Sequence, residues 1–300
     1  MNLVSSEDLS KEDINKILNI ADSLIENRSE RALREHSTLA LLFEKPSTRT
    51  RVSFETAIIQ LGGAPIYIDA SSSQLKRGEK ISDTAKVLSG YCDFIAARMS
   101  KHSDILEMAG SSSSPVINAL SDLEHPTQAL TDVYTIKQHF GNLRDVKIAF
   151  MGDIATNTAN SLMITAAKLG AEVALIGPAE QSPNVTYFNK AREYSKVWHY
   201  YDSIEEGLDD ADIIYTDTFV SMGNEDDAEK RRKLFAPYQV NSRALSYASK
   251  KALVMHCLPA HRGEEITADV IDGDRSIVWE QAKNKLLIAK AVLLFLSERA

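Results

Sequence analysis

The chain of 300 residues lacks the features that mark several classes of protein. It has only two cysteines, Cys92 and Cys257, and no Cys-x-x-Cys pair, so a zinc or redox motif of that type is not expected. Its longest apolar runs, such as 286–296, are interrupted by Lys290 and are too short to span a bilayer. The acidic N-terminus has no apolar core typical of a signal peptide, so we expect a cytoplasmic location without a membrane partner.

Excess positive charge is also absent, because 34 basic and 42 acidic residues give a net charge of −8. Residues 1–145 hold 16 basic and 20 acidic side chains, and residues 146–300 hold 18 and 22, so each half carries −4. Nucleic-acid binding is therefore not expected, and any bound anion must be held by a local arrangement of groups. A content of 44% hydrophobic and 25% charged residues is ordinary for a globular protein.

Short apolar runs alternate along the chain with stretches of helical period. The expected strands are 38–43, 65–69, 93–97, 115–119, 146–151, 172–177, 211–216 and 252–257. The expected helices include 7–26, 51–61, 81–90, 126–139, 158–169 and 280–297. Apolar strands alternating with helices predict parallel sheets covered on both faces, and two such sets predict two α/β domains.

The boundaries of these domains follow from the helix that connects them. Residues 126–140 have helical period and no turn signal before Gly141, so this helix is expected to join the domains. We predict one domain over 1–140, joined by the C-terminal helix 280–300, and a second over 145–279. A cleft between two such sheets is a common ligand site, because the carboxyl ends of the strands point into it.

The most informative segment is Ser47-Thr48-Arg49-Thr50-Arg51, between an expected strand and an expected amphipathic helix. Free backbone N–H groups lie at such a helix start, and the hydroxyl and guanidinium groups suit phosphate oxygens. This pattern predicts an anion site, although the spacing of a P-loop is absent. The alternative is an ordinary Ser/Thr N-cap with two solvated arginines.

A second candidate is His125, which precedes Pro126 at the expected start of a helix. The helix dipole disfavours imidazolium there, and a neutral histidine can donate to a carbonyl oxygen that gains negative charge. Gln128, one turn further on, can hold an amide group. The alternative is a capping histidine without a ligand.

Loops after strands of the second half also carry polar groups. Gly152-Asp153-Ile154 lacks the G-x-G-x-x-G spacing, which argues against a nicotinamide dehydrogenase, whereas Asn157 can present an amide to a polar substrate. Asp217, at the end of 211–216, can bind an ammonium group, or it lies in an exposed acidic loop.

The last of these loops begins at Cys257, at the end of the expected strand 252–257. This cysteine is a candidate nucleophile or a buried structural residue. His256 and His261 do not have a standard spacing for metal ligands, so no metal site is expected.

Together these segments resemble the aspartate/ornithine carbamoyltransferase family along nearly the whole chain, and Ser-Thr-Arg-Thr-Arg is highly specific to it. Asp217 with Ser221-Met222-Gly223, and His256-Cys257-Leu258-Pro259, are similar to the ornithine enzymes; aspartate enzymes usually carry His-Pro-Leu-Pro. The resemblance implies two Rossmann-like domains and transfer of a carbamoyl group from carbamoyl phosphate to the side-chain amine of L-ornithine. The products are L-citrulline and phosphate.

The resemblance also implies which residues act, with the first domain taking carbamoyl phosphate and the second ornithine. Its carbamoyl-phosphate ligands are Ser47, Thr48, Arg49, Thr50, Arg51, Gln74, Arg98, His125, Gln128, Cys257, Leu258 and Lys285. Its ornithine ligands are Asn157, Asp217, Ser221 and Met222, and its catalytic residues are Arg98, His125, Asp217 and Cys257. Lys285 stands where the family has an arginine, and it keeps the charge but loses the bidentate fork.

The family is trimeric or built from trimers, with sites at subunit interfaces, and it needs no metal or organic cofactor. The segment with Gln74 is similar to the family's loop that reaches the neighbouring subunit's site. A carbamoyltransferase for putrescine, N-acetylornithine or aspartate stays open as an alternative, and a non-catalytic paralogue is favoured only by Lys285. Both directions of flux, in arginine biosynthesis or degradation, use the same site.

Overall fold

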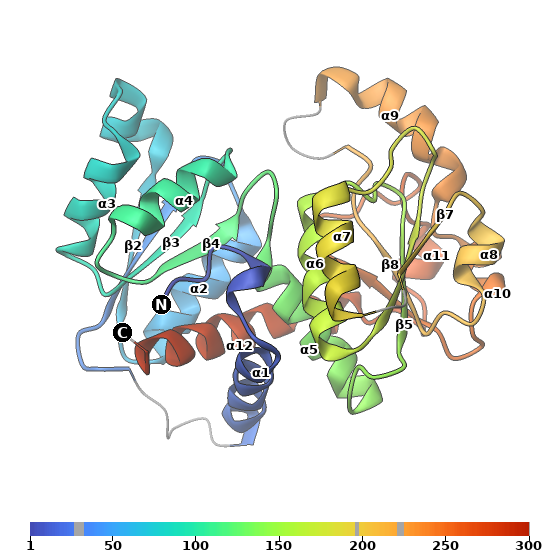
Figure 1. Ribbon diagram of the computed structural model, residues 1–300, viewed down its shortest axis with the longest axis horizontal. Helices are drawn as coiled ribbons and strands as arrows, with labels where there is room; N and C mark the ends of the chain where they lie inside the picture. The colour runs from blue at the N-terminus through green and yellow to red at the C-terminus, as the bar shows by residue number, and fades with distance from the viewer. Residues whose placement is uncertain (27–32, 196–197, 221–224, 300) are drawn as a thin grey trace. The chain divides into compact units, whose positions relative to one another are not determined.

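The computed structural model describes residues 1–26, 33–195, 198–220 and 225–299 (Figure 1). The chain folds into two compact units, one of Met1–Thr131 with Lys283–Ala300 and one of Asp132–Ala282. The chain passes between them twice, within helix α5 (Pro126–Phe140) and within helix α12 (Val278–Ser297). The α/β class with parallel sheets is confirmed.

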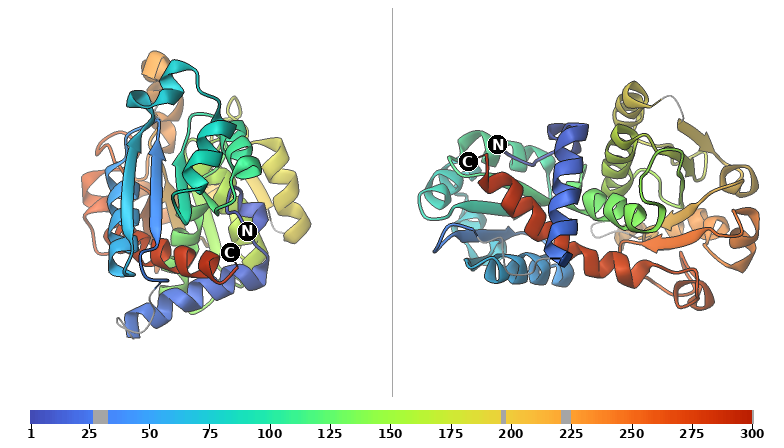
Figure 2. Two further views of the ribbon diagram at one scale, coloured as in Figure 1. Left: turned by 90° about the vertical axis from the view of Figure 1, so that its left-hand side faces the viewer. Right: turned by 90° about the horizontal axis from the view of Figure 1, so that it is seen from below.

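The first unit contains a four-stranded parallel sheet in the order β2-β1-β3-β4 (Figure 2). Its strands are β1 (Thr38–Phe43), β2 (Ala64–Asp69), β3 (Phe94–Arg98) and β4 (Val116–Leu120). Its helices are α1 (Lys11–Glu26), α2 (Thr48–Gln60), α3 (Ile81–Ser89) and α4 (His102–Ser111). Short 3-10 turns cover η1 (Ser6–Asp8), η2 (Ala70–Ser72) and η3 (Gln74–Arg77). The apolar runs of β1 and β3 are buried and form the centre of this sheet.

The second unit contains a five-stranded parallel sheet in the order β7-β6-β5-β8-β9. Its strands are β5 (Lys147–Met151), β6 (Glu172–Ile176), β7 (Trp198–Tyr201), β8 (Ile213–Thr216) and β9 (Leu253–His256). Its helices include α6 (Asn157–Leu169), α7 (Val185–Tyr194), α8 (Ile204–Leu208), α9 (Ala228–Phe235), α10 (Ser242–Tyr247) and α11 (Ala268–Ile271). The strand order reverses at β5, and polar ligands bind open α/β sheets at such a switch point.

The structure differs from the sequence-based expectation at three elements. Helix α2 begins at Thr48 rather than at residue 51, because the Ser47 side chain caps it by accepting from the Thr50 N–H. The expected helix 7–26 is divided into the η1 turn and α1. The edge strand β7 was not predicted, since Trp-His-Tyr-Tyr is not an apolar run.

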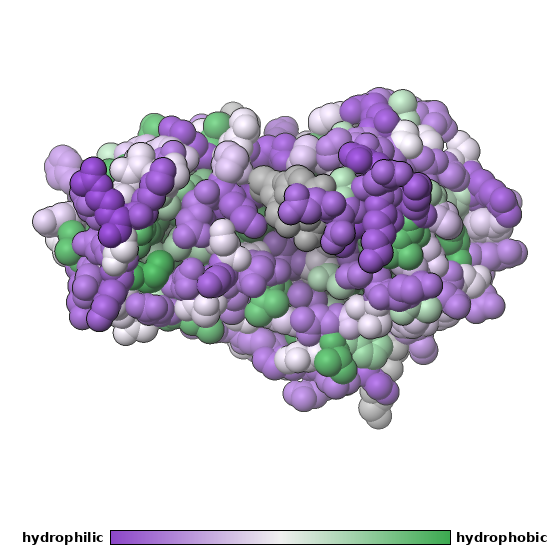
Figure 3. All heavy atoms as spheres, turned by 90° about the horizontal axis from the view of Figure 1, so that it is seen from above, coloured by the Kyte–Doolittle hydropathy of each residue, from purple (hydrophilic) through white to green (hydrophobic). Residues whose placement is uncertain are grey.

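Among the described residues, no helix is both long and apolar enough to cross a membrane. Figure 3 shows a face that carries mainly hydrophilic side chains, with apolar ones in small groups.

Gly152 illustrates how closely the loops pack at the switch point of the second sheet. Its φ of +112° lies in a region that L side chains rarely adopt. A Cβ atom built on it would lie 2.9 Å from Cε1 of Phe219, in the loop that follows β8. A side chain at this position therefore requires both backbone strain and movement of the Phe219 ring.

We expect Gly152→Ala to lower the free energy of unfolding by about 2 kcal/mol or more, because strain and overpacking add. Gly110→Ala is the control, because Gly110 lies in α4 with open space around its Cβ position. That change should leave stability unchanged or raise it by about 0.5–1 kcal/mol. Thermal unfolding measures both variants, and equal midpoints would contradict the account of Gly152.

Candidate active site

Three loops meet at the carboxyl edge of the first sheet. The Glu44 N–H, after β1, donates to the carbonyl oxygen of Arg98, at the end of β3, over 2.9 Å. The Ser100 N–H donates to Oε2 of Glu44 over 2.6 Å. After β4, Oδ1 of Asp122 accepts from the His102 N–H at 2.7 Å. These bonds fix the loops that carry Arg98 and the start of α2 side by side.

The start of α2 presents positive charge at this edge. Ser47 is the N-cap, Thr50 is buried, and no acidic residue occupies the first turn of the helix. Acidic side chains are the usual complement to the positive end of a helix dipole. Here the turn carries Arg49 and Arg51 instead, so the positive end is available to an anion.

Arg98 is a buried cation at the same edge, and its side chain is only 5% exposed. Within the described part of the chain, its Nε atom is buried and has no hydrogen-bond partner. Burial, with a smaller contribution from the nearby charge of Arg49, lowers the pKa of Arg98 to about 10. A buried guanidinium with an unused donor and another cation nearby is suited to an anion.

The two arginines of the motif are placed differently. Arg51 forms an ion pair with Glu55 Oε1 at 2.9 Å, and its guanidinium stacks 3.5 Å from the centre of the Tyr67 ring. Arg49 contributes instead to the electrostatic field at Arg98. The sequence alone gave no signal that separates these two residues.

His125 lies just before α5 and is buried. Burial first, and then the charges of Lys285 and Arg98, hold the pKa of His125 well below 6.5. The imidazole is therefore neutral, as expected, but burial rather than the helix dipole is the main cause. Lys285 on α12 donates from Nζ to Oε1 of Gln128 over 2.5 Å, so these two residues meet across 157 positions of sequence.

Gln74 is not brought to this cluster within the described chain. It is exposed in the η3 turn after β2, and its backbone oxygen accepts from the Glu79 N–H.

In the second unit, Asp217 and Cys257 meet after β8 and β9. The thiol of Cys257 donates from Sγ to Oδ1 of Asp217 over 2.9 Å, and the Thr218 N–H donates to the same oxygen over 2.8 Å. Asp217 is mostly buried, and Cys257 is partly exposed. Asn157 is the half-buried first residue of α6. The predicted ligands Ser221 and Met222 lie outside the described residues.

Arg231 supports the Asp217 loop, although no motif singled it out. This residue, on α9, pairs with the buried carboxylate of Asp153 and donates from Nε to the carbonyl oxygen of Phe219 over 2.8 Å. Because Phe219 is two residues beyond Asp217, this arginine ties the loop after β8 to the loop after β5.

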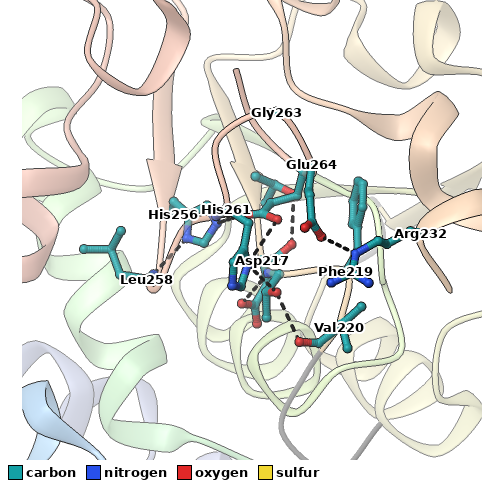
Figure 4. A network of polar contacts seen from close by, with 12 residues as sticks. Asp217, Phe219, Val220, Arg232, His256, Leu258, His261, Gly263 and Glu264 are labelled. Atoms are coloured by element: carbon teal, nitrogen blue, oxygen red, sulfur yellow. Dashed lines mark hydrogen bonds and ion pairs between the residues drawn. The ribbon is translucent and has the colours of Figure 1, made fainter. Parts of the chain in front are cut away.

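One group of described residues has the composition of a metal site. Ligand atoms of His261, Glu264 and Glu265 lie within 4.8 Å of one another. Protein donors already use both carboxylates, since Arg232 Nε donates to Glu264 Oε2 over 2.9 Å and His256 Nε2 lies 3.1 Å from Glu265 Oε1 (Figure 4). Contacts within the protein therefore hold most of the cluster, while Oε2 of Glu265 is buried without a hydrogen-bond partner among the described residues.

Comparison with known proteins agrees with this geometry. Residues 1–138 match the carbamoyl-P binding domain of aspartate/ornithine carbamoyltransferase, and residues 144–296 match its Asp/Orn binding domain. The chain belongs to the aspartate/ornithine carbamoyltransferase family.

Relatives in this carbamoyltransferase family match almost the whole chain. An ornithine carbamoyltransferase from Hyperthermus butylicus is 46% identical over 299 residues, covering 97% of this chain and 95% of the relative. The solved ornithine carbamoyltransferase from Pyrococcus furiosus has a TM-score of 0.92 at 44% identity, covering 97% and 95% of the two chains. The anabolic ornithine carbamoyltransferase from Campylobacter jejuni has a TM-score of 0.92 at 39% identity, covering 100% and 99%.

Lys285 allows a test of the electrostatics around His125 in this carbamoyltransferase. We expect Lys285→Met to raise the pKa of His125, because one of the positive charges that disfavour imidazolium is removed. The pKa should stay below 6.5, since burial is the larger cause and is unchanged. Titration of the imidazole C–H signals by NMR measures this shift.

Lys283→Met is the matched control, because Lys283 is an exposed lysine on the same helix. It should leave the His125 titration unchanged. A His125 pKa that stays constant or falls in Lys285→Met would contradict the electrostatic account.

Proposed function

We propose that this chain transfers the carbamoyl group of carbamoyl phosphate to the side-chain amine of L-ornithine, giving L-citrulline and phosphate. The observation that carries this proposal is the buried guanidinium of Arg98, whose Nε has no protein acceptor among the described residues, at the edge where α2 begins. Membership of the carbamoyltransferase family and the names of its relatives support the choice of ornithine.

Carbamoyl phosphate would bind in the first unit through its phosphate group. The N–H groups and hydroxyls at the start of α2, together with Arg49, Arg51 and Arg98, supply donors for the phosphate oxygens. The residues from that turn are Ser47, Thr48 and Thr50. Gln74 would complete the site of a neighbouring subunit, which agrees with its exposure here.

The carbonyl end of carbamoyl phosphate would lie toward His125. When the amine attacks, the carbonyl oxygen becomes anionic, and the neutral imidazole, Arg98 and Thr50 can donate to it. Gln128 would hold the carbamoyl amide. Lys285 fixes the orientation of Gln128, since an ammonium group only donates and therefore faces the amide oxygen.

Ornithine would bind in the second unit, with its side-chain amine at Asp217 and Cys257. An unperturbed alkyl ammonium has a pKa of about 10.4, so it must lose a proton before it can attack. The carboxylate and thiol would orient the amine and assist that loss, and Leu258 would lie beside the reacting groups. Asn157, Ser221 and Met222 would hold the amino-acid part.

The reaction then proceeds without a covalent enzyme intermediate. The amine nitrogen bonds to the carbonyl carbon, the tetrahedral intermediate collapses, and the C–O bond to phosphate breaks. Phosphate takes the electron pair of that bond and the proton that the attacking nitrogen must lose, and it leaves among the arginines. Cys257 acts as a polar partner of the amine, and no metal or organic cofactor is required.

Transfer to another amine is the alternative, and a panel of acceptors separates the two. Purified protein should form a carbamoyl product from carbamoyl phosphate and L-ornithine far faster than with putrescine, N-acetylornithine or L-aspartate. Turnover with one of these other amines but not with ornithine would reject the proposed substrate.

Removing Arg98 should separate activity from stability. We expect Arg98→Met to lower the turnover rate by about 10²–10³-fold or more, because the oxyanion loses a donor. The unfolding midpoint without ligand should stay unchanged or rise, since burial of an uncompensated cation is unfavourable. Arg243→Met, at an exposed arginine paired with Tyr247, is the matched control. Near-normal turnover in Arg98→Met would refute the assigned role.

We further propose that the enzyme is a homotrimer or a multiple of trimers. An exposed apolar surface on the first unit supports this: Val52 and Ile59, two turns apart on α2, are 51% and 57% exposed. Ile66, on the neighbouring edge strand β2, is 43% exposed. A second copy of the chain is the expected occupant. The name of the Campylobacter relative supports the anabolic direction, toward arginine biosynthesis. A cytoplasmic location is part of the same proposal.

The oligomer can be tested at Ile59. We expect Ile59→Lys to reduce the mass measured by light scattering from a multiple of three chains toward one chain, because the interface would bury a charge. Turnover should fall with it, since Gln74 would no longer reach a neighbouring site. Val185→Lys, at a residue of α7 that is 67% exposed, is the control. A wild-type mass of one chain would contradict the trimer.

A further inference from the structure

The loop that follows β9 is organised around a fully buried carboxylate. Glu265 is 0% exposed, and its Oε1 atom accepts from the backbone N–H of His261 over 2.5 Å. The same oxygen lies 3.1 Å from Nε2 of His256, whose side chain is also fully buried. A buried carboxylate requires such donors, because it has lost its hydration.

This contact determines which nitrogen of His256 carries a proton. Since the carboxylate accepts at Nε2, that nitrogen holds the hydrogen, and Nδ1 of a neutral ring is left as an acceptor. Nδ1 accepts from the backbone N–H of Leu258 over 2.8 Å (Figure 4). The backbone N–H of His256 itself donates to Oε1 of Gln281 over 3.0 Å. Glu265 thus fixes the acceptor that holds Leu258.

Leu258 needs this support because its backbone is strained. Its φ of 59° lies in the left-handed region, which is unfavourable for a residue with a side chain. The conformation of Leu258 sets the path of the chain next to Cys257, whose Sγ lies 2.9 Å from Asp217 Oδ1. A change at Leu258 would therefore move the thiol relative to the carboxylate.

Glu265 also acts at the other end of the loop. By accepting from the His261 N–H it places that ring, whose Nδ1 lies 3.1 Å from Oγ1 of Thr218. Thr218 follows Asp217 directly. The loops after β8 and β9 are therefore joined at two places, Asp217 with Cys257 and Thr218 with His261.

We propose that His256 and Glu265 are positioning residues that set the geometry of Asp217 and Cys257 for the amine substrate. This inference rests on the proposed function, in which these two residues receive the side chain of ornithine. Neither positioning residue touches the substrate: Glu265 fixes the proton on His256, and His256 holds Leu258.

Two substitutions at His256 test its two side-chain contacts separately, because each removes one contact and keeps the other. His256→Asn places an amide oxygen near the position of Nδ1, so it keeps an acceptor for Leu258 but removes the donor to Glu265. His256→Gln places an amide near the position of Nε2, so it keeps a donor to Glu265 but removes the acceptor for Leu258. A role in stability alone would make ornithine KM follow the unfolding temperature in both variants.

We expect the variant with the larger loss of stability to be the one with the smaller change in ornithine KM. His256→Gln should raise KM for ornithine by about 10–100-fold, because a small misplacement of reacting groups is costly. His256→Asn should have the lower unfolding temperature, since Glu265 loses a donor, yet retain an ornithine KM close to that of the wild type. Equal KM values for ornithine in the two variants would overturn the proposal.

Alkylation of Cys257 provides a readout that does not need turnover. In a Cys92→Ala background, where Cys257 is the only thiol, His256→Gln should change the alkylation rate and His256→Asn should not. The same rate in both variants would also overturn the proposal. If wild-type protein forms no citrulline, the proposed function fails, while the thiol rates still test the positioning of Cys257.

Discussion

The candidate site depends on positive charge that is buried before any anion arrives. Arg98 is almost fully enclosed at the end of β3, Lys285 is buried on α12, and neither the start of α2 nor the neutral His125 supplies a compensating negative charge. Burial of a cation is unfavourable, so other parts of the fold must offset its cost. The buried apolar residues of β1 and β3 provide that support. An anion that enters this edge meets donors that are already oriented, which is the arrangement that stabilises charge during acyl transfer.

The second unit carries the opposite charge in the corresponding place, after strands of a parallel sheet. Asp217 and Cys257 form one polar pair there, and Arg231 and the His256–Glu265 pair hold the loops on which they lie. Cations in the first unit and a carboxylate in the second fit a reaction between an anion and an amine. The anion needs positive charge around it, and the amine needs a negatively charged partner. A net charge of −8 is compatible with anion binding only because the cations act locally.

The sequence predicted those features that depend on neighbouring residues. Apolar runs in the sequence revealed eight of the strands, and the Ser47–Arg51 segment revealed a helix start without acidic residues. The edge strand β7 was missed because its aromatic residues form no apolar run. Contacts between distant residues left no local signal. Arg49 and Arg51 look equivalent in sequence, yet only Arg51 stacks on Tyr67; Glu264 and Glu265 are adjacent, yet only Glu265 is fully buried. The contact of Lys285 with Gln128 spans 157 residues.

The central claim is that the buried cations of the first unit form a site for the phosphate group of carbamoyl phosphate. Calorimetric titration of the wild-type protein with carbamoyl phosphate, in the absence of an amino acid, tests it most directly. We expect saturable binding of one carbamoyl phosphate molecule per chain, and inorganic phosphate should compete with it. No binding without ornithine, or binding that phosphate does not affect, would contradict it.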